Sequence, residues 1–232
     1  EFELEKMVVI EEINQQNDQP EEILFNYFLK RVWKSHSYGK TILGKEKDLN
    51  EINILDLKQF HDKRYTSENV CIAISGDLPE DILEILENCK IDTKVGNENT
   101  KHFENDIGFA IRSGKEKVFF EKLELSRLIM SWQVPESNDQ KATVGLEMLA
   151  SLLVDGRNSK LGKPLQEEQN LVESLNIELN KGEFGSLIIL EACCSRKNLN
   201  LVEKKINEIL RKFIETENYS QEELIKAKRI VE

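Results

Sequence analysis

The sequence has no long hydrophobic run, and nothing at its N-terminus resembles a signal peptide. A helix that spans a bilayer needs about 20 consecutive apolar residues, so we expect no membrane span. The sequence also lacks an excess of positive charge: it has 32 Lys and Arg and 43 Asp and Glu, so its net charge is -11. This balance argues against nucleic acid or an anionic membrane as the main partner. The 232 residues fit a soluble globular protein with one large or two ordinary domains, and they leave the compartment open between cytoplasm, periplasm and organelle.

Several motifs that would carry chemistry are absent. The four cysteines, Cys71, Cys89, Cys193 and Cys194, have neither the spacing of a zinc knuckle nor that of a disulfide framework, and we interpret them as reduced core thiols. There is no Gly-x-Ser-x-Gly element and no glycine-rich loop placed between a strand and a helix. These absences argue against a serine nucleophile and against a phosphate-binding loop.

Helical and extended patterns alternate on both sides of a polar segment. In the N-terminal part, periodicity predicts helices over 2–13, 20–33, 54–64 and from Pro79, with a strand over 69–74. Residues 92–114 are polar and aperiodic, which is typical of a linker. Beyond it we predict strands over 118–125 and 127–134, helices over 140–154, 158–169 and 199–214, a hairpin of 171–179 with 185–194, and a last helix after the capping box Ser220-x-x-Glu223. The order predicts an α+β fold of two repeated units, divided as residues 1–91, the linker and residues 115–232.

The first predicted helix carries two carboxylates within its apolar arc. At 100° per residue, Glu5 and Glu12 fall among Leu4, Val8 and Ile13, and their spacing of seven residues places them on one face. An unpaired buried carboxylate costs several kcal/mol and needs a cation, a metal or a set of donors. Two interpretations stay open from this helix alone: a metal or charge site, or two glutamates at the edge of the stripe that reach water.

Motifs in a fixed order link this helix to a known family. They are the glutamate pair Glu5 and Glu12, His36-x-x-Gly39 with Gly44, the set Phe60, Tyr65, Asn69 and Gly76-Asp77, and the later set Leu152-Leu153, Gly156, Ser159, Leu161 and Leu165. In this order the chain resembles the insulinase, pitrilysin and mitochondrial-processing-peptidase family of zinc peptidases over nearly its whole length. Ser37 departs from that family's pattern, which has proline at this position.

The resemblance implies a processing-peptidase-like metallohydrolase fold, in which each repeated unit is a mostly antiparallel sheet with helices packed on one face. It implies that Glu12 is the third zinc ligand and that Glu5 orients or electrostatically tunes the site without contacting the metal. The family's other two ligands and its general base come from an upstream His-x-x-Glu-His motif. This sequence contains only His36, His61 and His102, none in that arrangement.

A single carboxylate cannot hold catalytic zinc, which needs three protein ligands and a water. We therefore expect these 232 residues to be inactive alone and to bind no zinc, as part of a zinc metalloendopeptidase without its upstream motif. The alternative is a noncatalytic scaffold or partner subunit of the same fold. The start of the chain in mid-helix, without a cap, favours truncation.

The resemblance also implies partners. Peptide substrates would bind in extended form as an added strand, and a complementary homologous half or subunit would face the zinc. In that facing half the family carries an Arg and a Tyr seven residues apart, and here those positions are Gln166 and Glu173. Neither can replace the pair, since Gln is uncharged and an ionised Glu repels an oxyanion. We therefore expect this chain to be the metal-bearing half.

Overall fold

The computed structural model describes residues 1–89, 111–120, 123–216 and 219–231, and its packing divides the chain into two units. The first unit consists of residues 1–19 and the described part of 40–108. The second consists of residues 20–39 and the described part of 109–232. The predicted linker lies mostly outside the described residues, so the predicted domain boundaries stay predictions.

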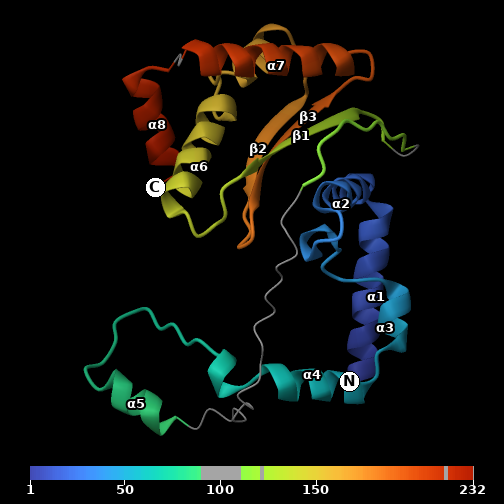
Figure 1. Ribbon diagram of the computed structural model, residues 1–232, viewed down its shortest axis with the longest axis vertical. Coiled ribbons are helices and arrows are strands. Elements are labelled where there is room, and N and C mark those ends of the chain that lie inside the picture. The colour runs from blue at the N-terminus through green and yellow to red at the C-terminus, as the bar shows by residue number, and fades with distance from the viewer. Residues whose placement is uncertain (90–110, 121–122, 217–218, 232) are drawn as a thin grey trace. The chain divides into compact units, whose positions relative to one another are not determined.

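The first unit contains helices of very different length. Its α-helices are α1 (Phe2–Asp18), α3 (Glu46–Glu51), α4 (Ile54–Arg64) and α5 (Ile82–Asn88), all labelled in Figure 1. α4 has the predicted bounds, because the Asn53 side chain accepts the N–H groups of Leu55 and Asp56 at 2.8 and 3.2 Å. The Asp56 carboxylate in turn accepts the Asn53 N–H at 2.9 Å and completes a capping box. α1 packs against α3 and extends beyond its predicted end at Ile13.

The first unit buries very little of its apolar surface. Within residues 1–19 and 40–89 only Ile13 and Thr66 are buried. The predicted strand over 69–74 is wrong for this structure, since residues 70–75 pair with no other described segment and a strand needs a neighbour to exchange backbone hydrogen bonds. Cys71 and Cys89 are exposed rather than core thiols, and both are free.

The second unit is built on a three-stranded antiparallel sheet. The strands are β1 (Ser126–Val134), β2 (Ser174–Asn180) and β3 (Ser186–Cys194), in the order β1-β3-β2. Both neighbours meet the middle of β3 at Leu190, which pairs with Met130 of β1 and Ile177 of β2. The predicted hairpin of β2 with β3 is confirmed, and so is the strand over 127–134.

Helices cover both faces of this sheet. They are α2 (Pro20–Trp33), α6 (Gln140–Val154), α7 (Leu199–Thr216) and α8 (Gln221–Val231), with two short segments, η1 (Ser37–Gly39) and the π-helical η3 (Lys163–Glu168). Ile188 and Leu190 of β3 pack into the core with side chains of α6 and α7. The alternate residues Leu187 and Ile189 point to the opposite face and pack with Val32 and Trp33 of α2. Helices α6 and α7 therefore lie on one face and α2 covers the other (Figure 1), so the prediction that helices pack on one face only is wrong for this sheet.

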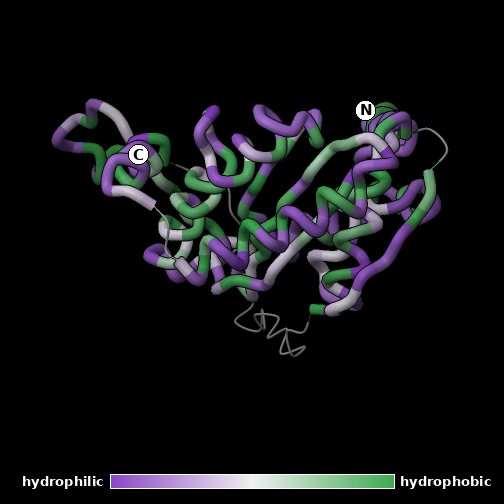
Figure 2. The backbone as a smooth tube through the Cα atoms, turned by 90° about the horizontal axis from the view of Figure 1, so that it is seen from above, coloured by the Kyte–Doolittle hydropathy of each residue, from purple (hydrophilic) through white to green (hydrophobic). Residues whose placement is uncertain are grey.

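The helix caps of this unit match their predicted positions. Asp139 accepts the N–H of Ala142 at 2.9 Å and begins α6. Ser220 and Glu223 bond reciprocally at the start of α8, with the Ser220 N–H at 2.7 Å from the Glu223 carboxylate. Hydrophobic and hydrophilic residues interleave along the described backbone (Figure 2). No helix in the described ranges is both long and apolar enough to cross a membrane.

The predicted strand over 118–125 is not found in residues 118–120 and 123–125, and positions 121–122 lie outside the described residues. The segment 111–120 makes polar contacts with helices and pairs with no strand. Its Arg112 N–H donates to the Val32 carbonyl of α2 at 2.9 Å, and Lys115 donates to Glu203 of α7 at 2.7 Å. The segment joins no ladder, so period-two hydrophobicity alone does not make it a strand.

Candidate metal centre and signature segment

Glu5 and Glu12 lie on α1 at a spacing of seven residues, about 10 Å along the helix axis at 1.5 Å per residue. Both are exposed, and among the described residues neither carboxylate has a hydrogen-bond or ion-pair partner. The helix is not buried as its pattern predicts, since Leu4 and Val8 of the same arc are 67% and 52% exposed. Both glutamates reach water, which is one of the two interpretations that the sequence left open. The physical reason is that α3 has 6 residues against the 17 of α1, and it covers only part of that helix.

Lys6, next to Glu5, fixes α1 against the end of α3. Its Nζ donates to the carbonyls of Asn50 and Ile52 at 3.2 and 2.9 Å. These carbonyls belong to the last turn of α3, where unpaired acceptors and the negative end of the helix dipole favour a cation. The glutamate pair is thus carried by a helix whose position in its unit is set by a polar contact.

The described residues supply one candidate metal ligand and not a set. No group of three or more His, Cys, Asp or Glu side chains in these ranges could hold a metal ion. His61 is exposed and stacks on Tyr65 with ring centroids 4.6 Å apart. His102 lies outside the described residues. Glu12 therefore fits zinc as a single carboxylate donor, and a complete tetrahedral site needs ligands from elsewhere.

His36, the histidine of the His-x-x-Gly loop, is buried in an aromatic cluster. Its Nδ1 accepts the backbone N–H of Tyr38 at 3.2 Å, and its ring lies at centroid distances of 4.4 Å from Tyr38 and 6.0 Å from Phe184. The Tyr38 hydroxyl accepts the Phe184 N–H at 3.3 Å, and Gly182 of the same turn leaves room for the Tyr38 ring. The loop motif thus holds the β2–β3 turn in this structure.

The second signature segment shapes the turn after α6. Gly156 has a φ of +80°, a conformation that favours glycine, and it lets the chain reverse after α6. Leu153 before this turn and Leu161 and Leu165 after it lie in the main core. The Ser159 hydroxyl is buried without a hydrogen-bond partner in the described chain. Gly156 and the three leucines are therefore explained by backbone geometry and packing, whereas nothing in the described chain explains Ser159.

Gln166 and Glu173 are brought together. Both side chains are exposed, and the Gln166 Nε2 donates to the backbone carbonyl of Glu173 at 3.0 Å. Between them Asn170 has a φ of +49°, a conformation that Asn tolerates better than most residues. One turn therefore brings Gln166 and Glu173 together, and the functional groups at these two positions are an amide and a carboxylate.

Sequence reasoning missed Glu191, which lies in the middle strand of the sheet on the face that α2 covers. It is half-buried, and burial raises the pKa of its carboxyl group, while the nearby Arg127 opposes the rise. Arg127 also donates to Glu21 of α2 at 2.9 Å. The only signal in the sequence was a lone Glu inside the apolar run of β3.

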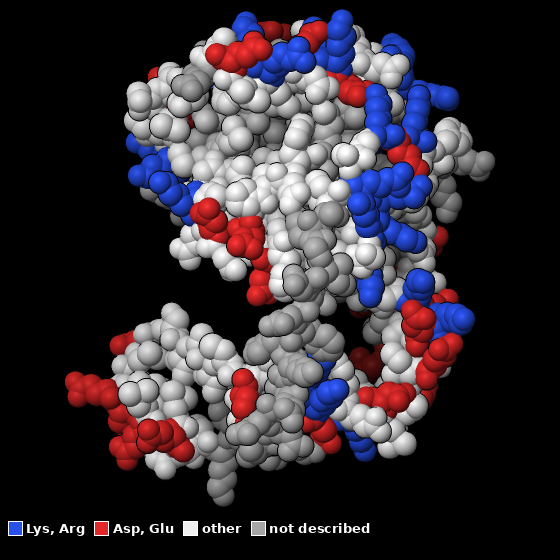
Figure 3. Space-filling view, viewed as in Figure 1, with Lys and Arg blue, Asp and Glu red and all other residues white. Residues whose placement is uncertain are grey.

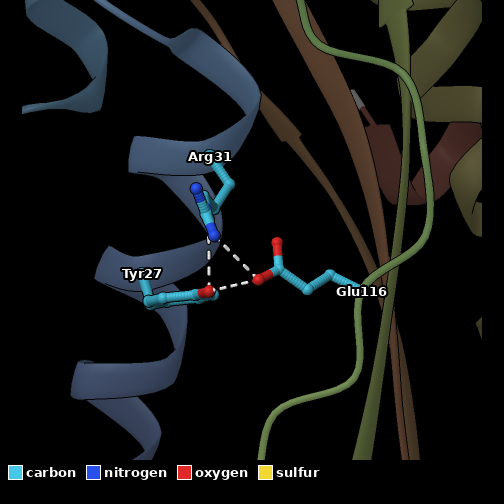
Figure 4. Close-up of polar contacts among 3 residues, drawn as sticks. All are labelled: Tyr27, Arg31 and Glu116. Atoms are coloured by element: carbon cyan, nitrogen blue, oxygen red, sulfur yellow. Dashed lines mark hydrogen bonds and ion pairs between the residues drawn. The ribbon is translucent and has the colours of Figure 1, made fainter.

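A second polar cluster fastens the segment 111–120 to α2 (Figure 4). The Tyr27 hydroxyl donates to the Glu116 Oε1 at 2.5 Å, and the Arg31 Nη2 donates to the same oxygen at 2.8 Å. The hydrogen bonds from Tyr27 and then from Arg31 lower the pKa of Glu116. Because all three side chains reach solvent, this cluster orients the segment and adds little stability.

The fold and the signature segments agree with comparisons to known proteins. The family described as the peptidase M16 inactive domain matches residues 51–231. An uncharacterized zinc protease of Rickettsia felis is 24% identical over 225 residues, which are 97% of this chain and 53% of that protein. The chain spans about half the length of that relative.

Solved structures share the fold. A protease from Helicobacter pylori superposes with a TM-score of 0.79 at 22% identity, covering 99% of this chain and 56% of that one. A chain of Complex III2 from Candida albicans superposes with a TM-score of 0.74 at 17% identity, covering 97% of this chain and 54% of that one. The chain belongs to the peptidase M16 family, and Glu5 and Glu12 precede the segment that matches its inactive domain.

Proposed function

We propose that this chain is part of a zinc metalloendopeptidase of the insulinase type and that Glu12 is one of the ligands of its zinc ion. The observation that carries the proposal is the pair Glu5 and Glu12 on α1, which has no partner among the described residues. Surface glutamates without partners are common, but here they lie seven residues apart in a chain of the M16 family. Their position ahead of residue 51 supports a role in the metal-bearing domain.

Three residues of α1 would have distinct roles at the zinc site. When bound, the zinc ion would act as a Lewis acid and lower the pKa of a water molecule. Glu12 would donate a carboxylate oxygen, and the remaining ligands would come from residues that precede Glu1. Glu5 would set the orientation and charge around Glu12 without contacting the metal, and Lys6 would hold the helix that carries both.

The second part of the proposal concerns the division of labour. Residues 1–91 would complete the metal-bearing domain and residues 115–232 would form the next domain, joined by the linker 92–114. A complementary homologous half would supply cationic and hydroxyl groups at the developing oxyanion, because Gln166 and Glu173 cannot. Peptide substrates would bind as an added strand, which favours unfolded segments over folded proteins.

Isothermal titration calorimetry with zinc tests the metal assignment. The 232-residue chain should show no site tighter than about micromolar, and a longer chain with the residues that precede Glu1 should bind one zinc ion. A tight one-to-one site in the 232-residue chain would refute the assignment, since the ligands would then be others.

Fluorogenic peptide cleavage tests the division of labour. The longer chain should cleave slowly alone, and the complementary half should raise the rate by about two orders of magnitude, the size expected for lost oxyanion donors. Full activity of the metal-bearing half alone, as a monomer by light scattering, would contradict this division.

A noncatalytic scaffold or partner subunit is the second candidate, and the likeness to a chain of Complex III2 favours it. A scaffold needs the helices and the sheet but not the glutamate pair. If the longer chain folds but binds no zinc and cleaves no peptide with any partner half, the scaffold function replaces the enzyme.

A further inference from the structure

A pocket of about 310 Å³ lies in the second unit between α6, β2 and the end of α8. α6 packs against both other elements, and Figure 1 shows α6 and α8 side by side. Part of the wall is apolar and includes Ile177 and Leu179 of β2 and Ile230 of α8. We call this site the α6–β2 pocket. The glutamate pair of α1 belongs to the first unit, so the metal assignment does not explain it.

Ser151 of α6 brings a hydroxyl group to the α6–β2 pocket. The residue is only 5% exposed, and its hydroxyl makes no hydrogen bond within the described part of the chain. A buried polar group without a partner costs free energy, so a ligand that bonds this hydroxyl gains affinity. The hydroxyl therefore points to a ligand with a polar group.

The charges around the α6–β2 pocket leave one carboxylate without a counter-charge. Lys181, just after β2, forms an ion pair with Glu147 of α6, so these two charges cancel. Asp155, which follows α6, has neither an ion pair nor a side-chain hydrogen bond among the described residues. Two carboxylates and one ammonium group give the lining residues a net charge of -1. The C-terminal end of α6 adds the negative pole of its dipole, which also favours a cation.

Glu147, Ser151 and Asp155 follow one another at intervals of four residues, about 6 Å apart along the helix axis, and so form a row on one face. A primary ammonium group has three N–H donors and no acceptor, so it can donate to the Asp155 carboxylate and the Ser151 hydroxyl together. We propose that the α6–β2 pocket binds a small primary amine, with its ammonium group between Asp155 and Ser151 and its apolar body against the side chains of β2 and α8.

Size and charge set the class of ligand. At about 30 Å³ per water molecule, 310 Å³ holds about ten water-sized groups, so an amine of about six non-hydrogen atoms fits. An anion would meet the net negative charge of the lining residues. A divalent metal ion is disfavoured, because Glu147 is already paired with Lys181 and the described ranges contain no group of three side chains that could hold one.

Chemical-shift titration of the ¹⁵N-labelled 232-residue chain with n-pentylammonium chloride tests the inference. The amides of Ser151, Asp155 and Leu179 should shift and saturate with a Kd of about 1 mM, which is within the range for a ligand of about six non-hydrogen atoms. The alcohol n-pentanol has the same length and no charge, so it should bind at least about tenfold more weakly. Equal binding of the two compounds would overturn the inference, and so would the absence of saturable shifts at these amides.

Two substitutions separate the two polar contacts. Asp155→Ala, at an exposed position, removes the charge and should raise the Kd at least about tenfold. Ser151→Ala removes only the hydroxyl and should raise the Kd about threefold. An unchanged Kd in Asp155→Ala would refute the site.

Glu84→Ala on α5 is the matched control for non-specific attraction of the ammonium ion. Across residues 1–19 and 40–89, Asp and Glu outnumber Lys and Arg by 17 to 7. Figure 3 shows acidic side chains gathered over α5. The control should leave the Kd unchanged. An equal rise in Kd for Glu84→Ala and Asp155→Ala would assign the binding to the acidic surface in general and refute the pocket.

Two further titrations identify the source of the amine. The longer chain should bind n-pentylammonium with the same Kd, and a loss of binding there would mean that the added residues cover the pocket and would overturn the inference. Nα-acetyl-lysine N-methylamide carries the same ammonium group on a lysine side chain. Tighter binding of this compound than of n-pentylammonium would assign the pocket to a lysine of a partner protein and refute a free amine. Zinc binding does not affect these outcomes, because no lining residue is a proposed zinc ligand.

Discussion

Glu191 gives the most direct way to test the electrostatics of the sheet. Its carboxyl group lies on β3, paired across the sheet with Ile129 and Asn176, under the face that α2 covers. Burial is the largest cause of its raised pKa, and the negative charge of Glu178 adds to it. Replacement by Gln keeps the shape and removes the charge, so the variant isolates the cost of ionisation.

The sign of the effect follows from linkage. Because the folded-state pKa of Glu191 is raised, its contribution to stability is fully present below the unfolded-state pKa. That contribution is lost as pH rises through the folded-state pKa. The Glu191→Gln variant should therefore be more stable than the wild type at pH 7 and should lose this advantage in mildly acidic solution. The carboxyl group is only half-buried, so we expect a gain of no more than about 1 kcal/mol, or roughly 2–4 °C in Tm.

Thermal unfolding followed by circular dichroism between pH 4 and pH 8 measures the difference. The matched control is Glu183→Gln in the exposed β2–β3 turn, which should shift Tm by less than about 1 °C at any pH. A Glu191→Gln variant that is less stable than the wild type at pH 7 would refute the reasoning. In that case the charge of Glu191 would be stabilised by Arg127 more than it is penalised by burial.

Two other substitutions test contacts that position the candidate sites. Gly182→Ala puts a Cβ 2.5 Å from the Tyr38 Cε2 and should destabilise the chain by about 1–3 kcal/mol in urea unfolding, whereas an unchanged midpoint would mean that Tyr38 does not hold this turn. Lys6→Met removes the bonds to the Asn50 and Ile52 carbonyls and should weaken zinc binding in the longer chain by about tenfold, with the exposed Lys58→Met as a control. Equal affinities for Lys6→Met and the wild type would show that this contact does not position α1.

Local sequence patterns predicted the helices and strands whose stabilising contacts come from residues close together in the chain. α4 begins after Asn53 and α8 after Ser220 because the capping side chains are within three residues of the N–H groups that they bond. The β2–β3 hairpin was predictable because its two strands pair with each other across a short turn.

Properties that depend on distant residues could not be read from the sequence. Glu191 appeared as a lone polar residue, and its burial depends on α2, which precedes it by more than 150 positions. Residues 70–75 have strand composition but no pairing partner in the described chain. The burial of the α1 arc failed as a prediction for the same reason, since amphipathic periodicity specifies a face but not the element that covers it.

The central claim is that Glu12 binds zinc and that Glu5 does not. In the longer chain, metal content by inductively coupled plasma mass spectrometry after dialysis should be near zero for Glu12→Gln and close to one ion for Glu5→Gln. Glu11→Gln, an exposed neighbour about 100° around the helix, is the matched control and should retain the full ion. Equal zinc retention in Glu12→Gln and Glu11→Gln would contradict the claim and remove α1 from the metal site.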